Sequence, residues 1–282
     1  MTRKSSIHKF ARVIAATFVC CFVSSVLGLT AVAADKTKES ENLEQQLTAA
    51  KIAFELDSEG QITAVTIGHK EAPISVGTLK LLGKIKTLKS IRSDAAFDNV
   101  STEELAAIGA IKSLETLSLD SCDFQGSDLK KLATLPKLTK IEFVDSTLDD
   151  FGAKGLSTIK TLKVLSLNGN QITDGGLKAL CNMKELQELS VAKNREDRLK
   201  QNSSTISDAG LPSLKGLKQL KSLNLSGCLI SDAGLKTLSS LKTLESLKLA
   251  NTKATPDGIA KLQQALTDCK IVTKDESSTS KE

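Results

Sequence analysis

The chain has 282 residues, with 38 Lys and Arg against 33 Asp and Glu and a formal net charge of +5. Four basic residues and no acid lie before residue 34, so removal of that segment would leave a net charge of +1. A nearly neutral chain argues against nucleic acid and anionic membranes as partners, because both require a concentrated basic surface. The sequence also contains no Trp or Tyr, the side chains that most often anchor protein interfaces.

Residues 1–33 have the organisation of a secretory signal peptide. A basic start is followed by an uncharged apolar run over residues 13–29, and Ala31-Val32-Ala33 supplies a motif of small residues for cleavage. We therefore expect export to the periplasm, the cell envelope or the medium, with Ala34 as the first residue of the mature chain. The alternative is an uncleaved membrane anchor, because the apolar run is close to the lower limit of about 17 residues for a membrane helix.

Residues 34–41 are polar and charged, which predicts a mobile linker. Residues 42–68 predict a cap made of a helix and a hairpin. Apolar residues on one face from Leu43 onward indicate the helix, and strand-like runs at 52–56 and 62–67 indicate the hairpin. Such a cap would cover the first strand of the repeats that follow.

A 24-residue repeat dominates the rest of the chain. The pattern Leu-x-x-Leu-x-Leu recurs with its middle apolar residue at positions 117, 141, 165 and 189 and, after an insertion, at 223 and 247. A fixed period of this size is typical of a solenoid. The alternation predicts a short strand with one buried face, and leucines three residues apart in the second half predict a helix or a 3₁₀ turn.

A hydroxyl residue followed by an aspartate precedes several of the predicted helices, as at Thr173, Ser207 and Ser231. The hydroxyl can cap the helix, and the acid is favourable near the positive end of the helix dipole. Ser101 and Glu104 predict a capping box on an earlier helix. The recurring acids are interpreted as helix caps rather than as a calcium site, since they lack the dense Asp and Asn pattern of a calcium loop. They are Asp150, Asp174, Asp208 and Asp232.

Residues 171–177 and 229–235 read Gln-Ile-Thr-Asp-Gly-Gly-Leu and Leu-Ile-Ser-Asp-Ala-Gly-Leu. They resemble the ITDAGL signature of leucine-rich repeats, of the cysteine-containing, ribonuclease-inhibitor-like type found in many exported bacterial proteins. The resemblance is clear over residues 114–262 and extends weakly back to about residue 62. It implies an α/β fold, a curved leucine-rich-repeat solenoid over residues 69–272, with a parallel concave sheet and helices on the convex side.

In the family that this resemblance points to, one side chain per repeat hydrogen-bonds the backbone of the turn between neighbouring repeats. That ladder position holds Cys122, Ser146, Asn170, Asn194, Cys228 and Thr252. The four cysteines beyond residue 33 are expected to be unbridged. Cys122 and Cys228 lie about 19 Å apart at about 4.8 Å per strand, whereas bridged Cα atoms lie within about 7 Å. Residues 273–282 contain no apolar side chain and are predicted to be disordered.

The sequence lacks a recognisable catalytic or metal site. His69 is the one histidine beyond residue 33, so a catalytic triad or a His-rich metal centre would depend on it alone. The cysteine spacings match no zinc motif, and the chain has no glycine-rich phosphate loop. We therefore expect no enzyme activity, no cofactor and no metal. An enzyme that uses His69 is the alternative, which loss of activity in His69→Ala with folding intact would support.

Residues that flank the strand leucines are expected to point outward from the sheet, where they form a small, polar candidate surface for a partner protein. The candidates are Thr116, Ser118, Asp120, Lys140, Glu142, Ser166, Asn168, Glu188, Ser222, Asn224 and Lys248. The second candidate surface is the insertion 195–205, in which Arg195 and Arg198 are the residues to mutate. Lysines that recur before each strand are interpreted as a solvated basic edge interleaved with acids.

Together these features predict an exported, monomeric, non-enzymatic leucine-rich-repeat scaffold that acts by protein–protein interaction. A surface adhesin or a glycan-binding protein is the alternative. A substrate-recognition subunit of a ubiquitin ligase, which uses similar repeats, ranks below both, because the chain carries an export signal and no helical region similar to an F-box.

Overall fold

A computed structural model describes residues 38–68, 75–94, 100–124, 128–193 and 206–274. The chain divides into two compact units, residues 1–35 and 36–282, and every described residue belongs to the second. Several of the predicted features lie outside the described residues: the signal peptide, His69, Asn194, the insertion with Arg195 and Arg198, and residues 275–282.

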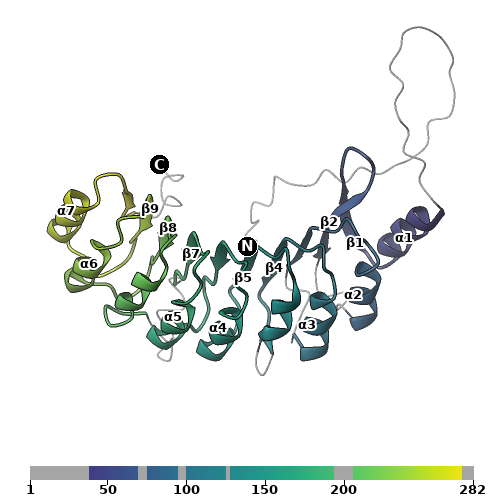
Figure 1. Cartoon of the computed structure of the whole chain (residues 1–282), viewed down its shortest axis with the longest axis horizontal. Coiled ribbons are helices and arrows are strands. Elements are labelled where there is room, and N and C mark those ends of the chain that lie inside the picture. Colours follow the sequence, from purple (N-terminus) through teal and green to yellow (C-terminus); the bar gives the residue numbers. More distant parts are fainter. Residues whose placement is uncertain (1–37, 69–74, 95–99, 125–127, 194–205, 275–282) are drawn as a thin grey trace, which may run out of the picture. The chain divides into compact units, whose positions relative to one another are not determined.

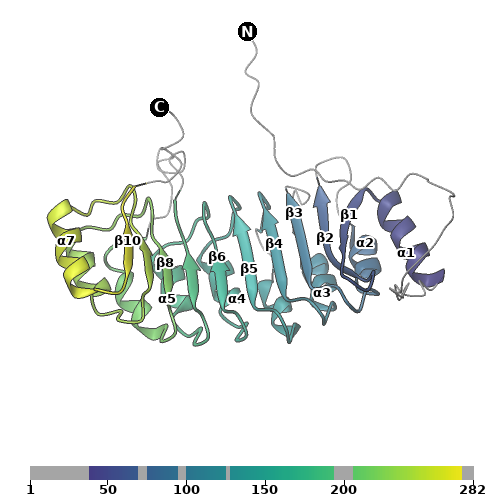
Figure 2. The same cartoon turned by 90° about the horizontal axis from the view of Figure 1, so that it is seen from above.

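Ten strands form one sheet in which neighbours follow one another in chain order (Figure 2). β1 and β2 pair antiparallel, and all later neighbours pair parallel. The predicted α/β leucine-rich-repeat solenoid is therefore confirmed. The strands are β1 (Ile52–Leu56), β2 (Ile62–Gly68), β3 (Ser90–Asp94), β4 (Thr116–Asp120), β5 (Lys140–Val144), β6 (Val164–Ser166), β7 (Glu188–Ser190), β8 (Ser222–Asn224), β9 (Ser246–Lys248) and β10 (Lys270–Val272).

Helices and 3₁₀ helices lie together on one side of this sheet (Figure 1). The predicted caps are confirmed at Thr173 and Ser231, whose hydroxyls accept hydrogen bonds from backbone N–H groups of the first turn. The prediction for Ser207 is wrong, because η3 begins only after Gly210 and the Ser207 hydroxyl accepts from Ala209 in the preceding turn. The capping box of Ser101 and Glu104 is also present. The elements are α1 (Lys38–Ala49), α2 (Val76–Leu82), α3 (Thr102–Gly109), η1 (Leu129–Thr134), α4 (Asp150–Leu156), α5 (Asp174–Leu180), η3 (Leu211–Gly216), α6 (Asp232–Leu238) and α7 (Pro256–Ala265).

The first helix begins earlier than the sequence pattern indicated. α1 starts at Lys38, so the linker predicted for residues 34–41 is wrong for residues 38–41. The apolar spacing that predicted the helix begins only at Leu43. However, Lys and Glu are good helix formers, and acids are favourable near a helix N-terminus. The hairpin of β1 and β2 occupies the predicted positions.

Leucine and isoleucine side chains of the repeats fill one core between the sheet and the helices. The middle residues of the strands pair with one another in register and are at most 1% exposed, and burying each contributes about 1.5–3 kcal/mol. They include Leu117, Ile141, Leu165, Leu189, Leu223 and Leu247. Among the described helices, none combines the length and the apolar character that a membrane span requires.

A carboxylate links each of the later repeats to the next one. Asp208 accepts hydrogen bonds from the backbone N–H of Ser231 at 2.9 Å and from its hydroxyl at 2.5 Å. The expected role of these acids was to favour the start of their own helix. The structure adds a second role, because each carboxylate also accepts hydrogen bonds from the cap residue of the following repeat. The same pairing joins Asp150 to Thr173, Asp174 to Ser207, and Asp232 to Thr255.

A glycine shortly after each cap residue leaves space for the carboxylate of the preceding repeat. A Cβ atom on Gly258 would lie 2.1 Å from Asp232 Oδ1, far inside van der Waals contact. Gly234 faces Asp208 in the same way. We call this arrangement, an Asp against the hydroxyl residue and the Gly of the next repeat, the Asp–hydroxyl–Gly link. Pro256 occupies the position of the next aspartate, so the links that begin at Asp150 end at α7.

Candidate functional site

The outward side chains of the sheet form straight rows, because β2 to β10 pair without a shift in register. Neighbours within a row lie about 4.8 Å apart. Two of these rows together are called the sheet face. One row contains Ser90, Thr116, Lys140, Val164, Glu188, Ser222 and Ser246, and the other contains Thr66, Arg92, Ser118, Glu142, Ser166, Ser190, Asn224 and Lys248.

The sheet face brings together most of the candidate residues predicted from the sequence, but their exposure differs. Glu188 and Lys248 are exposed, whereas most of the others are half-buried. Ser118 is only 5% exposed, so it offers little surface to a partner. A serine is shorter than the arginine and glutamate that flank it in the row, which accounts for its burial. Asp120 lies at the end of β4, next to Val144 of β5 in the register.

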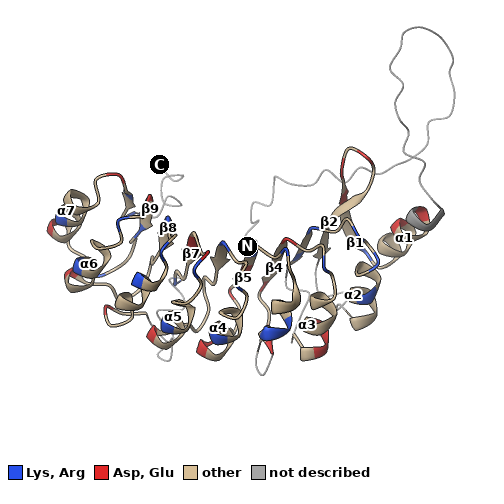
Figure 3. Cartoon of the chain, in the orientation of Figure 1, with Lys and Arg blue, Asp and Glu red and all other residues tan. Residues whose placement is uncertain are grey.

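Charged residues are spread along the strands and helices of the described unit (Figure 3). On the sheet face they are Arg92 on β3, Lys140 and Glu142 on β5, Glu188 on β7 and Lys248 on β9. Lys140 and Glu142 form an ion pair at 3.1 Å on the same strand. Arg92 is exposed and lies two strands from Glu142 in the same row, with Ser118 between them. The sequence analysis missed Arg92. The spacing of Leu88 and Ile91, which matches the later repeats, is the signal that would have placed it on this surface.

Beyond β5, hydroxyl and amide groups lie on this surface beside the exposed Glu188 and Lys248. Asn168, which follows β6, donates from Nδ2 to Ser166 Oγ at 3.2 Å, and its Oδ1 accepts from Ser190 Oγ at 2.6 Å. Asn168 Oδ1 also accepts from the backbone N–H of Ala192 at 2.9 Å. Because these bonds hold the side chain in place, this part of the surface is ordered before any partner binds.

The ladder position has the structural role that the resemblance implied at Ser146 and Asn170. Ser146 Oγ accepts from the backbone N–H of Cys122 at 3.0 Å, and Asn170 Oδ1 accepts from the backbone N–H of Leu148 at 3.0 Å. Thr252 differs, because its hydroxyl donates to Leu249 O within its own repeat.

The described cysteines are unbridged, and the buried Cys228 and Cys269 are suited to packing rather than to chemistry. Burial raises the pKa of the Cys228 thiol to about 12, although the nearby ammonium of Lys193 opposes the shift. Burial likewise raises the pKa of Cys269. Both thiols therefore stay protonated near neutral pH, the form that does not act as a nucleophile or metal ligand. Within the described part of the chain, His, Cys, Asp and Glu side chains form no group of three that could hold a metal ion.

Several lysines before the strands have a structural role that the sequence analysis did not assign. The ammonium of Lys160 donates to Ser157 O at 2.7 Å, at the end of α4. Lys242 donates to Ala265 O of the next repeat at 2.7 Å, and Lys112 donates to both Gly109 O and Thr134 O. Cations are favourable at the negative end of a helix dipole, so these lysines stabilise helix C-termini.

Comparison with known proteins gives a family match for two segments. Residues 158–181 and 218–239 match a family model described as Leucine Rich repeat. No match is found among the curated proteins.

Three solved structures are among those to which the chain is similar. The plant peptide hormone receptor RGFR1 in complex with RGF2 shares 15% identity at a TM-score of 0.47, over 79% of this chain and 36% of the receptor chain. Internalin C2 from Listeria monocytogenes shares 20% identity at a TM-score of 0.48, over 85% of this chain and 87% of that one. The LRR protein LIC12759 of Leptospira interrogans shares 18% identity at a TM-score of 0.36, over 68% and 62% of the two chains. This chain thus spans about a third of the receptor's length.

Proposed function

We propose that this chain, whose fold is a leucine-rich-repeat solenoid, is an exported, non-enzymatic scaffold that binds another protein through its sheet face. Leucine-rich repeats are typical scaffolds for protein–protein interaction. The proposal of export follows from the signal-peptide pattern of residues 1–33 and places the protein in the periplasm, the cell envelope or the medium. An uncleaved N-terminal segment would instead anchor it to a membrane.

One observation carries the choice of surface: charges of both signs and hydroxyl groups are held in register across β3 to β9. Arg92 offers a guanidinium, and the ion-paired Lys140 and Glu142 remain partly exposed. A polypeptide presents both charged side chains and backbone amides, which such a surface can pair. The chain has no Trp or Tyr to stack on sugar rings, which weighs against a glycan.

The test is capture of a partner from envelope and secreted fractions with residues 34–282, followed by measurement of the dissociation constant with the purified partner. The sheet-face variant is Arg92→Glu/Glu142→Lys. The matched control on the helices is Lys178→Glu/Glu103→Lys, which likewise reverses one exposed cation and one exposed acid and leaves the net charge unchanged. We expect the sheet-face variant to weaken binding about tenfold or more and the control to leave it unchanged, because charge reversal inside an interface costs several kcal/mol.

A third variant, Arg195→Glu/Arg198→Glu, tests the insertion. Loss of binding in this variant alone would contradict the choice of the sheet face and move the contact to the insertion. If residues 34–282 capture no more than an unrelated exported control protein, the protein-binding function itself is contradicted.

A further inference from the structure

A hollow lies at the N-terminal cap. A cavity of about 420 Å³ lies between α1, the turn of the hairpin and the end of α2. Its lining includes Leu43, Ile62, Leu81, Lys84, Ile85 and Lys86. A second, more open hollow of about 620 Å³ shares Gln46, Leu81 and Lys84 with it and adds Lys80.

No Asp–hydroxyl–Gly link holds α1 to α2, in contrast to the helices from α4 onward. Between α4 and α7, the Asp–hydroxyl–Gly link draws each helix start against the next. α1 contains no aspartate and therefore supplies no such link to α2. On α1, Leu47 is fully buried, whereas Leu43 stays half-buried at the cavity. The apolar face of α1 is thus only partly covered by the chain.

The cavity combines an apolar floor with a cationic rim. Ile62 and Ile85 are each 5% exposed and, with Leu43 and Leu81, supply the floor. Lys84 and Lys86 are exposed, and neither forms an ion pair with any residue that the structure describes. The neighbouring Lys89 differs, because it pairs with Glu115 at 3.9 Å. Glu44 also lines the cavity and adds one carboxylate, so the two lysines leave its charged lining with one net positive charge.

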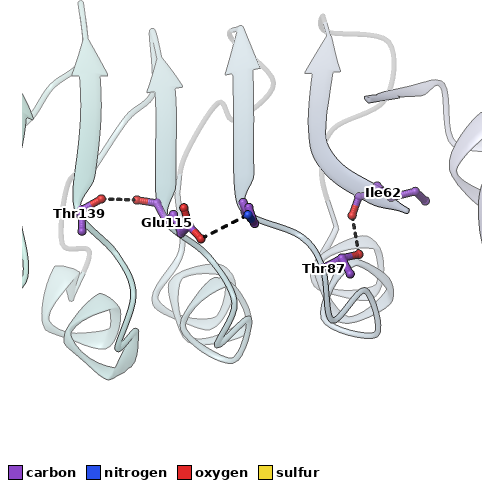
Figure 4. A network of polar contacts seen from close by, with 5 residues as sticks. Ile62, Thr87, Glu115 and Thr139 are labelled. Carbon is purple, nitrogen blue, oxygen red and sulfur yellow. Dashed lines mark hydrogen bonds and ion pairs between the residues drawn. The ribbon is translucent and has the colours of Figure 1, made fainter. Parts of the chain in front are cut away.

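The two walls of the cavity opposite α1 are fixed by hydrogen bonds. The hydroxyl of Thr87 donates to Ile62 O at 2.7 Å and ties the turn after α2 to the start of β2 (Figure 4). In the hairpin turn, Asp57 Oδ1 accepts from the backbone N–H groups of Glu59 and Gln61, both at 2.9 Å. A cavity with fixed walls binds a ligand without first having to be ordered.

We propose that this cavity binds a small amphiphilic anion, a molecule with an apolar body and one carboxylate, sulfonate or phosphate head. The body would cover Leu43, Leu81 and Ile85, and the head would lie between the ammonium groups of Lys84 and Lys86. The volume falls within the range of about 300–1,000 Å³ that is usual for small-ligand sites. This site is separate from the sheet face and does not depend on the proposed function.

The test uses residues 34–282, since residues 36–282 form a compact unit with their own core. The first probe is 1-anilinonaphthalene-8-sulfonate, whose fluorescence can be followed without background because the chain has no Trp or Tyr. The second is decanoate, which should displace the first and be detected by calorimetry. We expect saturable binding at one site and at least about tenfold weaker binding of decanol, which lacks the charge.

Two pairs of lysine substitutions distinguish binding in the cavity from general electrostatic attraction. Lys84→Glu/Lys86→Glu should weaken decanoate binding at least about tenfold. Lys137→Glu/Lys163→Glu makes the same change of charge at exposed lysines in the turns before β5 and β6, and it should leave binding within about twofold of the parent. Leu43→Asp, checked by circular dichroism for an intact fold, should abolish binding by placing a carboxylate on the apolar floor.

Three results would overturn the proposal. They are the absence of saturable decanoate binding, equal weakening by the two lysine pairs, and equal affinity for decanol and decanoate. A fourth arm uses vesicles of phosphatidylglycerol. Binding to these vesicles without binding of monomeric decanoate would also overturn it, because the anion would then be recognised only as part of a membrane.

Discussion

At the scale of single residues, the carboxylate of Asp232 shows how one side chain serves a neighbouring repeat. It accepts hydrogen bonds from the backbone N–H of Thr255 at 2.8 Å and from the Thr255 hydroxyl at 2.7 Å. These bonds stabilise the ionised form and lower the pKa of Asp232 from its ordinary value of 3.8. A residue that looks like a helix cap in the sequence is thus also an acceptor for the start of α7.

The lowered pKa of Asp232 predicts a dependence of stability on pH. When the folded-state pKa lies below the unfolded one, the stabilisation is complete above the unfolded pKa and is lost as the pH falls through the folded pKa. We expect Asp232→Asn to be less stable than the parent at neutral pH, and the difference to shrink as the pH falls below about 3.8. Urea unfolding followed by circular dichroism at several pH values measures it, with Asp268→Asn at an exposed site as the control. A difference that stays constant from neutral pH to pH 2 would contradict the assignment.

At the scale of elements, both ends of a helix are completed by a neighbouring repeat or its turn. The N-terminus of α7 receives the carboxylate of Asp232 from the previous repeat. The C-terminus of α7 receives the ammonium of Lys242 on Ala265 O. A helix this short is marginal by itself, so these contacts and the buried leucines stabilise it. The elements therefore depend on their position in the stack more than on their own helix propensity.

The Asp–hydroxyl–Gly link predicts coupling between Asp232 and Gly258. Gly258→Ala alone should lower the free energy of unfolding by about 1–3 kcal/mol, because the new methyl group displaces the carboxylate. In the Asp232→Ala background the same change should cost nothing, since Ala is the better helix former by about 0.5–1 kcal/mol. Urea unfolding of the two single variants and the double variant measures this coupling. Additive effects would show that the two residues are independent.

The elements were predictable where the sequence pattern is local, and less so where the decisive contact joins two repeats. The period of Leu117 and its equivalents predicted the strands, and Thr173 and Ser231 predicted helix caps, because both signals lie within one repeat. The partner of Asp232 lies in the next repeat, so local spacing could not show it. The start of α1 at Lys38 was missed because its first turn carries no apolar residue.

For the candidate site, strand alternation predicted which side chains lie on the sheet face, but not how far each is exposed. Ser118 is buried because of the size of its neighbours in adjacent strands, a property of three repeats together. The cavity at the cap could not be predicted either, because it results from incomplete packing of α1. That the sheet face binds a partner remains a prediction.

At the scale of the whole described unit, each strand pairs only with the strands before and after it in the chain. Stability in such a stack is close to a sum of repeat terms and terms between neighbours. A destabilising substitution in a central strand should therefore change the unfolding transition differently from one in an end strand. Leu165 in β6 is 1% exposed and central, whereas Ile271 in β10 is half-buried at the last strand.

We expect Leu165→Ala to cost about 2–5 kcal/mol and to broaden or split the unfolding transition, because it weakens the connection between two halves of the stack. Ile271→Ala should cost less and leave the main transition sharp. Urea unfolding with hydrogen exchange resolved by peptide distinguishes the two, since fraying should be confined to α7 and β10 in the second variant. An equal loss of stability with equally sharp transitions would argue against a stack of semi-independent repeats.

The Asp–hydroxyl–Gly link also bears on how a gene for this fold can change in length. Each link joins one repeat to the next through the same atoms, from Asp150 to Thr255. Recombination between two repeats at equivalent positions would add or remove a whole unit, and every remaining aspartate would still meet a hydroxyl and a glycine. The length of the sheet, and with it the area offered to a partner, can therefore change in single steps without an unfavourable intermediate.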